Sequence, residues 1–432
     1  MIATIRNAWR VEEIRKKLLF VLFMILLYRL GNSVTVPYVN TSMLSEYFAS
    51  LNNTFLWLMN TMSGSALERA SIFALSIQPY INASIIIQLL TVAIPALERL
   101  QKEGGEDGKK TIEKITRYST IGIAILQGYG YYILIRNGFN GVSMLSENAT
   151  GFWVPIVIVA TFMTGSTLLM WMGEQITEFG IGNGISVILF ASIVARFPSQ
   201  VGTMIGSVID VPGNWWIYVL MMLGALAIVV LIVVVNNSER RIPVQYSKRV
   251  VGRKMYGGQS THLPMKVNMS GVLPVIFAQS IASIPATIVV FVPEWQDGWV
   301  MRVFDTNSLP YALVYFLLIV FFSYFYSTIQ FNPIEIANNL KKNGGFIPGF
   351  RAGKPTSEFI QKVLTKITLF GAMYLAIIAV TPILISRFSE TARASGISLG
   401  GTSIIIVVSV ALETIKQLES QLLMRHYKGF LE

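Results

Sequence analysis

The sequence contains no cysteine and few charged residues for its length. Without cysteine among its 432 residues, disulfide bonds, thiolate metal sites and cysteine nucleophiles are excluded. The two histidines, His262 and His426, lie far apart in polar segments, so they have no metal-ligand spacing. Charged residues make up 13% of the chain, against about 25% in soluble domains. Most of the surface must therefore face lipid or other apolar surface, and we expect neither a metal nor a cofactor.

Long apolar runs are what the chain has in abundance. A very large soluble core is the alternative, but the runs extend over about 18 to 25 residues, enough to cross a hydrocarbon core of about 30 Å. The first run follows Arg15, Lys16 and Lys17 and lacks a small-residue cleavage site, so it is a retained span and not a signal peptide. The sequence predicts about ten spans, at residues 18–36, 72–96, 118–136, 152–172, 183–201, 215–236, 270–292, 309–331, 364–386 and 397–415.

The distribution of basic residues predicts the orientation of these spans. The net charge is +11, and most of the 34 lysine and arginine residues fall in the N-terminus, the C-terminal tail and the loops at 97–117, 237–267 and 332–366. By the positive-inside rule, these loops and both termini are cytoplasmic. The remaining basic residues are all arginines, at Arg29, Arg69, Arg136, Arg196, Arg302, Arg387 and Arg393.

About ten spans divide into two sets of five, a N-terminal half at residues 1–201 and a C-terminal half at 202–432. Because each half has an odd number of spans, the second half runs opposite to the first. Inverted repeats are built in this way, with a working site between the halves near the membrane midplane. Equal numbers alone are weak evidence for such a repeat.

The segment at residues 54–70 does not fit a simple span. It is too short and too polar to cross the membrane, and too apolar for an ordinary exposed loop. One interpretation is a short amphipathic helix that re-enters the protein, where irregular backbone is shielded from lipid. The other is an interfacial helix that lies flat on the membrane, and the residues leave both open.

Catalytic and ion-coupling groups are scarce. The carboxylates Glu174, Glu178, Glu335 and Glu413 lie near predicted span ends, whereas ion pathways normally use ionisable groups within spans. An ion-coupled small-solute transporter therefore becomes the weaker alternative. The glycines at 180–184 lack the strand and downstream acid of a nucleotide-binding loop, so a tight turn capped by Asn183 or Ser186 is predicted. With no nucleophile or metal constellation, an intramembrane enzyme is disfavoured.

Two polar loops, at residues 238–268 and 332–363, combine basic, aromatic, proline and glycine residues. Loops of this length are often functional. Their composition suits docking to a large partner that is acidic or contains RNA phosphate. The alternative is that they are solvated loops that only set the topology.

Several stretches match a known family, namely residues 69–75, 79–90, 173–178, 182–186 and 400–403, together with the two polar loops. In these stretches the chain resembles the SecY translocase family, whose members form the central subunit of the bacterial protein-conducting channel. The resemblance implies an all-α membrane protein with about ten transmembrane helices. These form two pseudo-symmetric inverted five-helix halves around a central pore, with a short re-entrant plug helix at about 54–70.

The resemblance also implies a ring of aliphatic side chains that closes the pore. A narrow apolar collar resists wetting and so blocks ions, while aliphatic chains yield around a passing polypeptide. Matched residue by residue, the collar consists of Ile77, Ile81, Ile185, Leu189, Ile276 and Ile406.

The resemblance likewise implies which residues form the plug and the lateral gate. Family members often have Ser-Gly-Gly-Ala in the plug, where this chain has serine in the third place. The plug would consist of Asn60, Thr61, Met62, Ser63, Gly64, Ser65, Ala66, Leu67, Glu68, Arg69 and Ala70. The gate, between the second and seventh spans, would use the polar residues Asn82, Gln88, Gln279 and Ser283.

The family's activity and partners follow as expectations. Unfolded secretory polypeptides would cross through the channel, membrane segments would leave laterally into lipid, and the SecA motor or the ribosome would drive transport. We also expect SecE-like and SecG-like small membrane subunits, binding of signal sequences, and a multi-pass location in the bacterial cytoplasmic (inner) membrane. Docking is expected at Arg240, Arg241, Lys248, Arg249, Lys341, Lys342 and Arg351.

Overall fold

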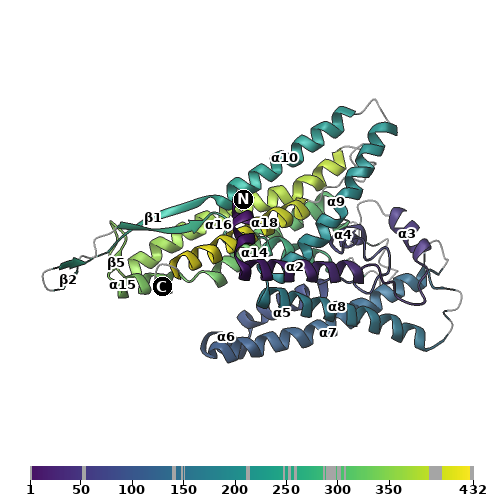
Figure 1. Cartoon of the computed structure of the whole chain (residues 1–432), viewed down its shortest axis with the longest axis horizontal. Coiled ribbons are helices and arrows are strands. Elements are labelled where there is room, and N and C mark those ends of the chain that lie inside the picture. The colour runs from purple at the N-terminus through teal and green to yellow at the C-terminus, as the bar shows by residue number, and fades with distance from the viewer. Residues whose placement is uncertain are drawn as a thin grey trace.

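A computed structural model gives the fold of most of the chain. The structure describes residues 2–50, 55–138, 143–146, 149, 151–210, 215–246, 249–251, 254–256, 260–285, 288, 298, 303–305, 308–388 and 401–428. Helices dominate, and short strands occur near one end of the molecule (Figure 1).

Each predicted span overlaps a helix. These helices are α2 (Glu12–Gly31), α5 (Gln78–Ala93), α7 (Gly105–Asn137), α8 (Trp153–Phe179), α9 (Gly184–Asp210), α10 (Trp215–Asn237), α11 (Leu273–Ala282), α14 (Leu309–Gln330), α16 (Lys354–Phe388) and α18 (Gly401–Lys428).

These helices differ in whether their length and apolar composition suffice for crossing a membrane. In the described part of the chain, α8, α9, α10, α14, α16 and α18 contain stretches that are long and apolar enough. The helix α5 and the following α6 (Pro95–Glu103) would make a seventh span, although the chain bends by 104° between them. Of the others, α2 and α7 begin with charged residues, and α11 has only 10 residues.

The long helices pack in two groups. In the first, α7 packs between α5 and α8, and α8 also contacts α2 and α9. In the second, α14 packs against α11 and α16, and α18 contacts α10 and α16. Contacts of α18 with α9 and of α11 with α5 join the groups, and the largest apolar core draws side chains from both.

The turn before α9 brings backbone segments close together. Gly182 has a φ of 92°, in the left-handed region that favours glycine. A Cβ at Gly184 would overlap the carbonyl oxygen of Gly173 on α8. The Asn183 side chain accepts hydrogen bonds from the backbone N–H groups of Ile185 (3.1 Å) and Ser186 (3.4 Å). The predicted tight turn with an Asn183 cap is therefore confirmed.

The two polar loops form one sheet, which the sequence did not predict. β1 (Glu239–Tyr246) pairs with β4 (Ser260–Lys266) on one side and β5 (Gly345–Phe346) on the other, so the sheet joins both loops. The short strands β2 (Arg249–Val251) and β3 (Lys254–Tyr256) pair beyond them. Ile242 and Val244 of β1 are buried over α16, while their neighbours along the strand are exposed. This alternation is typical of a half-buried strand.

The basic segments gather at one end of the molecule. The sheet, α6 and α15 (Pro333–Lys342) lie toward this end, whereas α3 (Thr41–Ser50) lies toward the opposite end and α4 (Phe55–Met62) lies further inside (Figure 1). The N-terminal helix α1 (Ile2–Arg10) packs through Ala8 against the late part of α18 at Leu418. This arrangement agrees with the basic loops lying on one side of the membrane.

Candidate functional site

Six aliphatic side chains belong to the largest apolar core cluster, which draws on both helix groups. They come from the start of α5, from α9, from α11 and from α18. Five of them are at most 7% exposed, and Ile185 is partly buried against the same cluster. The set is the one implied by the resemblance, namely Ile77, Ile81, Ile185, Leu189, Ile276 and Ile406.

A glycine lies next to these six residues, which we call the collar. Gly173 of α8 faces it, because a Cβ built there would lie 3.4 Å from Ile185 Cγ1 and 3.5 Å from Ile77 Cδ1. On α9, Ile185 and Leu189 are four residues apart and so share one helix face. Gly173 therefore lies close to Ile77 and Ile185, and the six side chains of the predicted collar share one apolar cluster although they come from separate elements.

The plug segment begins with α4 and continues as a series of turns over residues 63–77. Its residues from Asn60 to Gly64 are buried, so the segment is inside the protein and is not an interfacial helix. Asn60 Nδ2 donates to Glu68 Oε2 (2.6 Å), and the Glu68 backbone N–H donates back to Asn60 Oδ1 (3.1 Å). The Leu67 N–H donates to Ser63 Oγ (3.3 Å), which closes the turn further.

Polar groups from four helices hold the plug segment, among them Tyr131 of α7, which donates its hydroxyl to the Leu67 carbonyl. Tyr28 of α2 donates its hydroxyl to the Ser63 carbonyl (3.0 Å) and lies 2.7 Å from Ser192 Oγ of α9. Arg196 of α9 donates to Thr61 Oγ1 (2.8 Å). Sequence reasoning missed these holding residues, although a tyrosine and an arginine within apolar helices are a signal of a polar contact.

The helix α11 also holds the plug segment, through a hydrogen bond to a methionine sulfur. Gln279 Nε2 of α11 donates to Met62 Sδ at 3.0 Å. Met62 also belongs to the same core cluster as the collar residues. The end of α4 therefore shares one apolar core with the six aliphatic residues.

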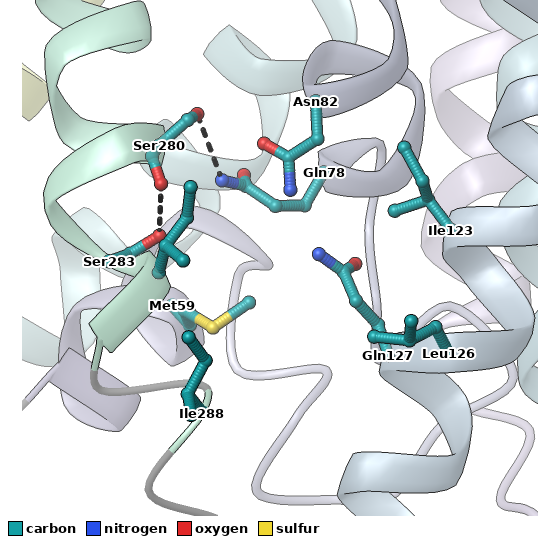
Figure 2. Close-up of a pocket in the computed structure, with 10 residues that line it drawn as sticks. Met59, Gln78, Asn82, Ile123, Leu126, Gln127, Ser280, Ser283 and Ile288 are labelled. Carbon is teal, nitrogen blue, oxygen red and sulfur yellow. Dashed lines mark hydrogen bonds between the residues drawn. The ribbon is translucent and has the colours of Figure 1, made fainter. Parts of the chain in front are cut away.

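A cavity of about 390 Å³ opens beside this contact, between α5, α7 and α11. The amides of Gln78, Asn82 and Gln127 point into the same space (Figure 2). Gln78 Nε2 donates to Ser280 Oγ of α11 at 3.5 Å, which is a long and weak hydrogen bond. Within the described part of the chain, Asn82 Oδ1 and Gln127 Oε1 are buried without a hydrogen-bond partner.

The structure brings together only part of the predicted gate. Asn82 and Ser283 line the cavity, but Gln279 turns to the plug segment. Gln88 contacts Ser84 of its own helix at 3.5 Å. Sequence reasoning missed Gln78, Gln127 and Ser280, which, like Asn82, are polar residues in an apolar stretch.

Basic side chains are exposed at the sheet end of the molecule. Arg240 and Arg241 lie on β1, Lys341 and Lys342 end α15, and Arg351 follows β5. Of the remaining predicted docking residues, Lys248 lies outside the described residues and Arg249 begins β2, with no described side chain.

The turn that carries Arg351 is held firmly. Phe350 stacks on Phe359 of α16 with ring centroids 4.3 Å apart. Thr356 Oγ1 donates to the Arg351 carbonyl at 2.7 Å. The Arg351 side chain is exposed, so the fold presents a cation on a fixed turn.

Known proteins resemble this chain along its whole length. The sequence model of the SecY family matches residues 71–415. The protein translocase subunit SecY of Streptomyces coelicolor is 45% identical over 441 residues, and that of Mycobacterium tuberculosis is 42% identical over 447 residues. Each alignment covers 100% of both chains. The chain belongs to the SecY family.

Solved structures of SecY-like channels share the fold. A protein-conducting channel superposes with a TM-score of 0.68 at 16% identity, covering 94% of this chain and 92% of that chain. A SecY protein whose plug domain stabilises the closed state gives a TM-score of 0.65 at 17% identity, with the same coverage. The predicted fold class of this SecY-family chain is confirmed.

One plug position departs from the pattern expected in the SecY family. Ser65 has a φ of 70°, in the left-handed region that costs a non-glycine residue about 1–2 kcal/mol. The preceding Gly64 has a φ of 68°, and a Cβ there would lie 2.9 Å from the Ser192 carbonyl oxygen. Gly64 is therefore required by both conformation and space, whereas Ser65 carries local strain.

We predict that Ser65→Gly stabilises the protein by about 1 kcal/mol, because it removes this strain. Thermal unfolding of the purified protein in detergent would show a higher midpoint. Ser63→Gly is the matched control, because Ser63 donates to the Asn60 carbonyl and accepts from the Leu67 N–H. The control should lower the midpoint, and a lower midpoint for Ser65→Gly would contradict the prediction.

Proposed function

We propose that unfolded secretory polypeptides cross the membrane through the centre of this chain and that membrane segments leave it laterally into lipid. The observation that carries the proposal is the collar, where aliphatic side chains from both helix groups meet and the plug segment packs against them. An apolar constriction of this kind excludes ions when closed. Aliphatic side chains also change rotamers easily, so they can surround a polypeptide of any sequence.

The plug segment is proposed to seal the collar in the resting state. It is held by hydrogen bonds from Tyr28, Tyr131, Arg196 and Gln279. Individual hydrogen bonds contribute about 0.5–1.5 kcal/mol, or up to about 3 kcal/mol when one group is charged. A polypeptide that enters the pore can therefore displace the segment reversibly.

The lateral exit is proposed to lie between α5 and α11. Their polar contact is the weak Gln78–Ser280 hydrogen bond beside a cavity with unsatisfied amide oxygens. Unsatisfied buried polar groups are costly, so this contact is poorly stabilised and suited to opening. Residues 1–201 and 202–432 would then move as two halves, which agrees with the two groups in which the helices pack.

The energy for transport is proposed to come from a partner at the sheet end. The exposed arginines and lysines there suit the SecA motor or the ribosome, and Sec61 is known from a ribosome–channel complex. SecE-like and SecG-like subunits would cover part of the lipid-facing surface. We place the protein in the bacterial cytoplasmic membrane with the basic loops and both termini inside.

The relatives favour a channel over the alternative functions. They are protein translocase subunits along their full length, which argues against an ion-coupled small-solute transporter. On the basis of these relatives, we propose a passive channel without catalytic activity of its own.

The collar makes a direct prediction about ion leakage. Replacing Ile81 and Ile276 together by serine should raise ion conductance, because the hydroxyl groups favour wetting of the constriction. Conductance would be measured with purified protein in planar bilayers. Ile86→Ser is the control on the same helix, since Ile86 is 45% exposed on the outer surface. Equal conductance of the double variant and the control would refute the collar assignment.

The exposed basic residues at the sheet end, which we call the docking face, lead to a prediction about transport. Arg351→Glu should slow SecA-driven translocation into reconstituted vesicles by about tenfold, because reversing one charge weakens a complementary electrostatic contact. Insertion of the chain into the membrane should be unaffected. Arg136→Glu, at the exposed C-terminal end of α7, is the matched charge reversal away from the sheet and should transport normally. Normal transport by Arg351→Glu would remove this residue from the docking face.

A further inference from the structure

A second cavity, of about 470 Å³, lies between α2 and the plug segment. Its volume falls within the range of about 300–1,000 Å³ that is usual for ligand pockets. Its walls come from the second half of α2 and from the turns of residues 64–69. This cavity is separate from the lateral contact and the collar described above.

Two arginines line this cavity from different segments. Arg29 is in the last turn of α2 and Arg69 is in the turns after α4, and both side chains are exposed. Within the described part of the chain, neither has a carboxylate within salt-bridge distance. One arginine near a span end can extend to the membrane interface. Two arginines that line the same cavity give it a positive charge, which an anion bound there would offset.

The cavity continues into a lipid-facing apolar stripe. Leu22, Leu26 and Leu30 occur at intervals of four residues, so they share one face of α2, and all three line the cavity. They are 55%, 55% and 58% exposed, as expected for side chains that face hydrocarbon. Cationic groups at one end of a hydrocarbon-facing stripe match the two parts of an amphiphile.

Polar groups complete the cationic end. Ser33 and Ser65 line the cavity with hydroxyl groups, and Asn32, 5% exposed, lies in its wall. Arginine side chains bind phosphate oxygens through paired N–H donors, and hydroxyl and amide groups add further donors. This donor set fits a phosphodiester.

We propose that this cavity binds an anionic phospholipid, with its phosphodiester between Arg29 and Arg69 and an acyl chain along the leucine stripe. The proposal goes beyond the channel function proposed above. Because Arg69, Gly64 and Ser65 belong to the plug segment, the lipid would bridge α2 and the plug. Membrane composition would then act directly on the stability of the plug.

Lipid retention measured by native mass spectrometry tests the proposal. The full chain would be purified in detergent with equal amounts of phosphatidylglycerol and phosphatidylcholine. We expect preferential retention of phosphatidylglycerol and about tenfold weaker retention in Arg29→Gln and in Arg69→Gln, because each loses a charge-assisted contact. Arg136→Gln is the control, as an exposed arginine at a helix end outside the cavity.

Two further experiments distinguish binding of a lipid from binding of a free phosphate, and a loss of binding from a loss of folding. Soluble glycerol phosphate at the same concentration should not displace phosphatidylglycerol, and Leu26→Asn should weaken retention of the lipid. If Arg29→Gln unfolds at a lower temperature than the wild-type chain, Arg29→Lys keeps the charge and should show intermediate retention. Equal retention of both lipids, unchanged retention in Arg29→Gln and Arg29→Lys, or full displacement by glycerol phosphate would each overturn the proposal.

Discussion

The aliphatic contact at the centre of the molecule is the constraint on which the other features depend. Ile81 of α5, Ile276 of α11 and Ile406 of α18 meet there with residues of α9, so helices distant in the sequence share one apolar cluster. Apolar contacts are non-directional and tolerate rearrangement, whereas a charged or hydrogen-bonded closure would require particular partners. A contact of this kind can close a membrane channel and still open for polypeptides of many sequences.

Directional interactions surround this contact and determine how it is covered. Tyr28, Tyr131, Arg196 and Gln279 reach the plug segment from four helices, and each donates a hydrogen bond to it. The lateral contact between α5 and α11 is weaker still, with one long hydrogen bond and unsatisfied amide oxygens.

The sequence predicted the helices well because apolar runs long enough to cross a membrane have few other folds. It missed the sheet, since the alternation of Ile242 and Val244 with exposed residues covers only a few positions of β1. It also could not place polar side chains within helices. Gln88 contacts its own helix while Gln78 reaches α11, and only the rotation of α5 in the packed structure distinguishes the two.

The central claim is that the collar surrounds the translocating polypeptide. The chain has no cysteine, so single cysteines at Ile81 and Ile276 are clean crosslinking sites. A preprotein stalled during translocation, with a cysteine in its middle, should form disulfides with both positions. A cysteine at the outward-facing Ile86 should form none. Crosslinking at Ile86 but not at Ile81 and Ile276 would show that the polypeptide takes another path and would contradict the account.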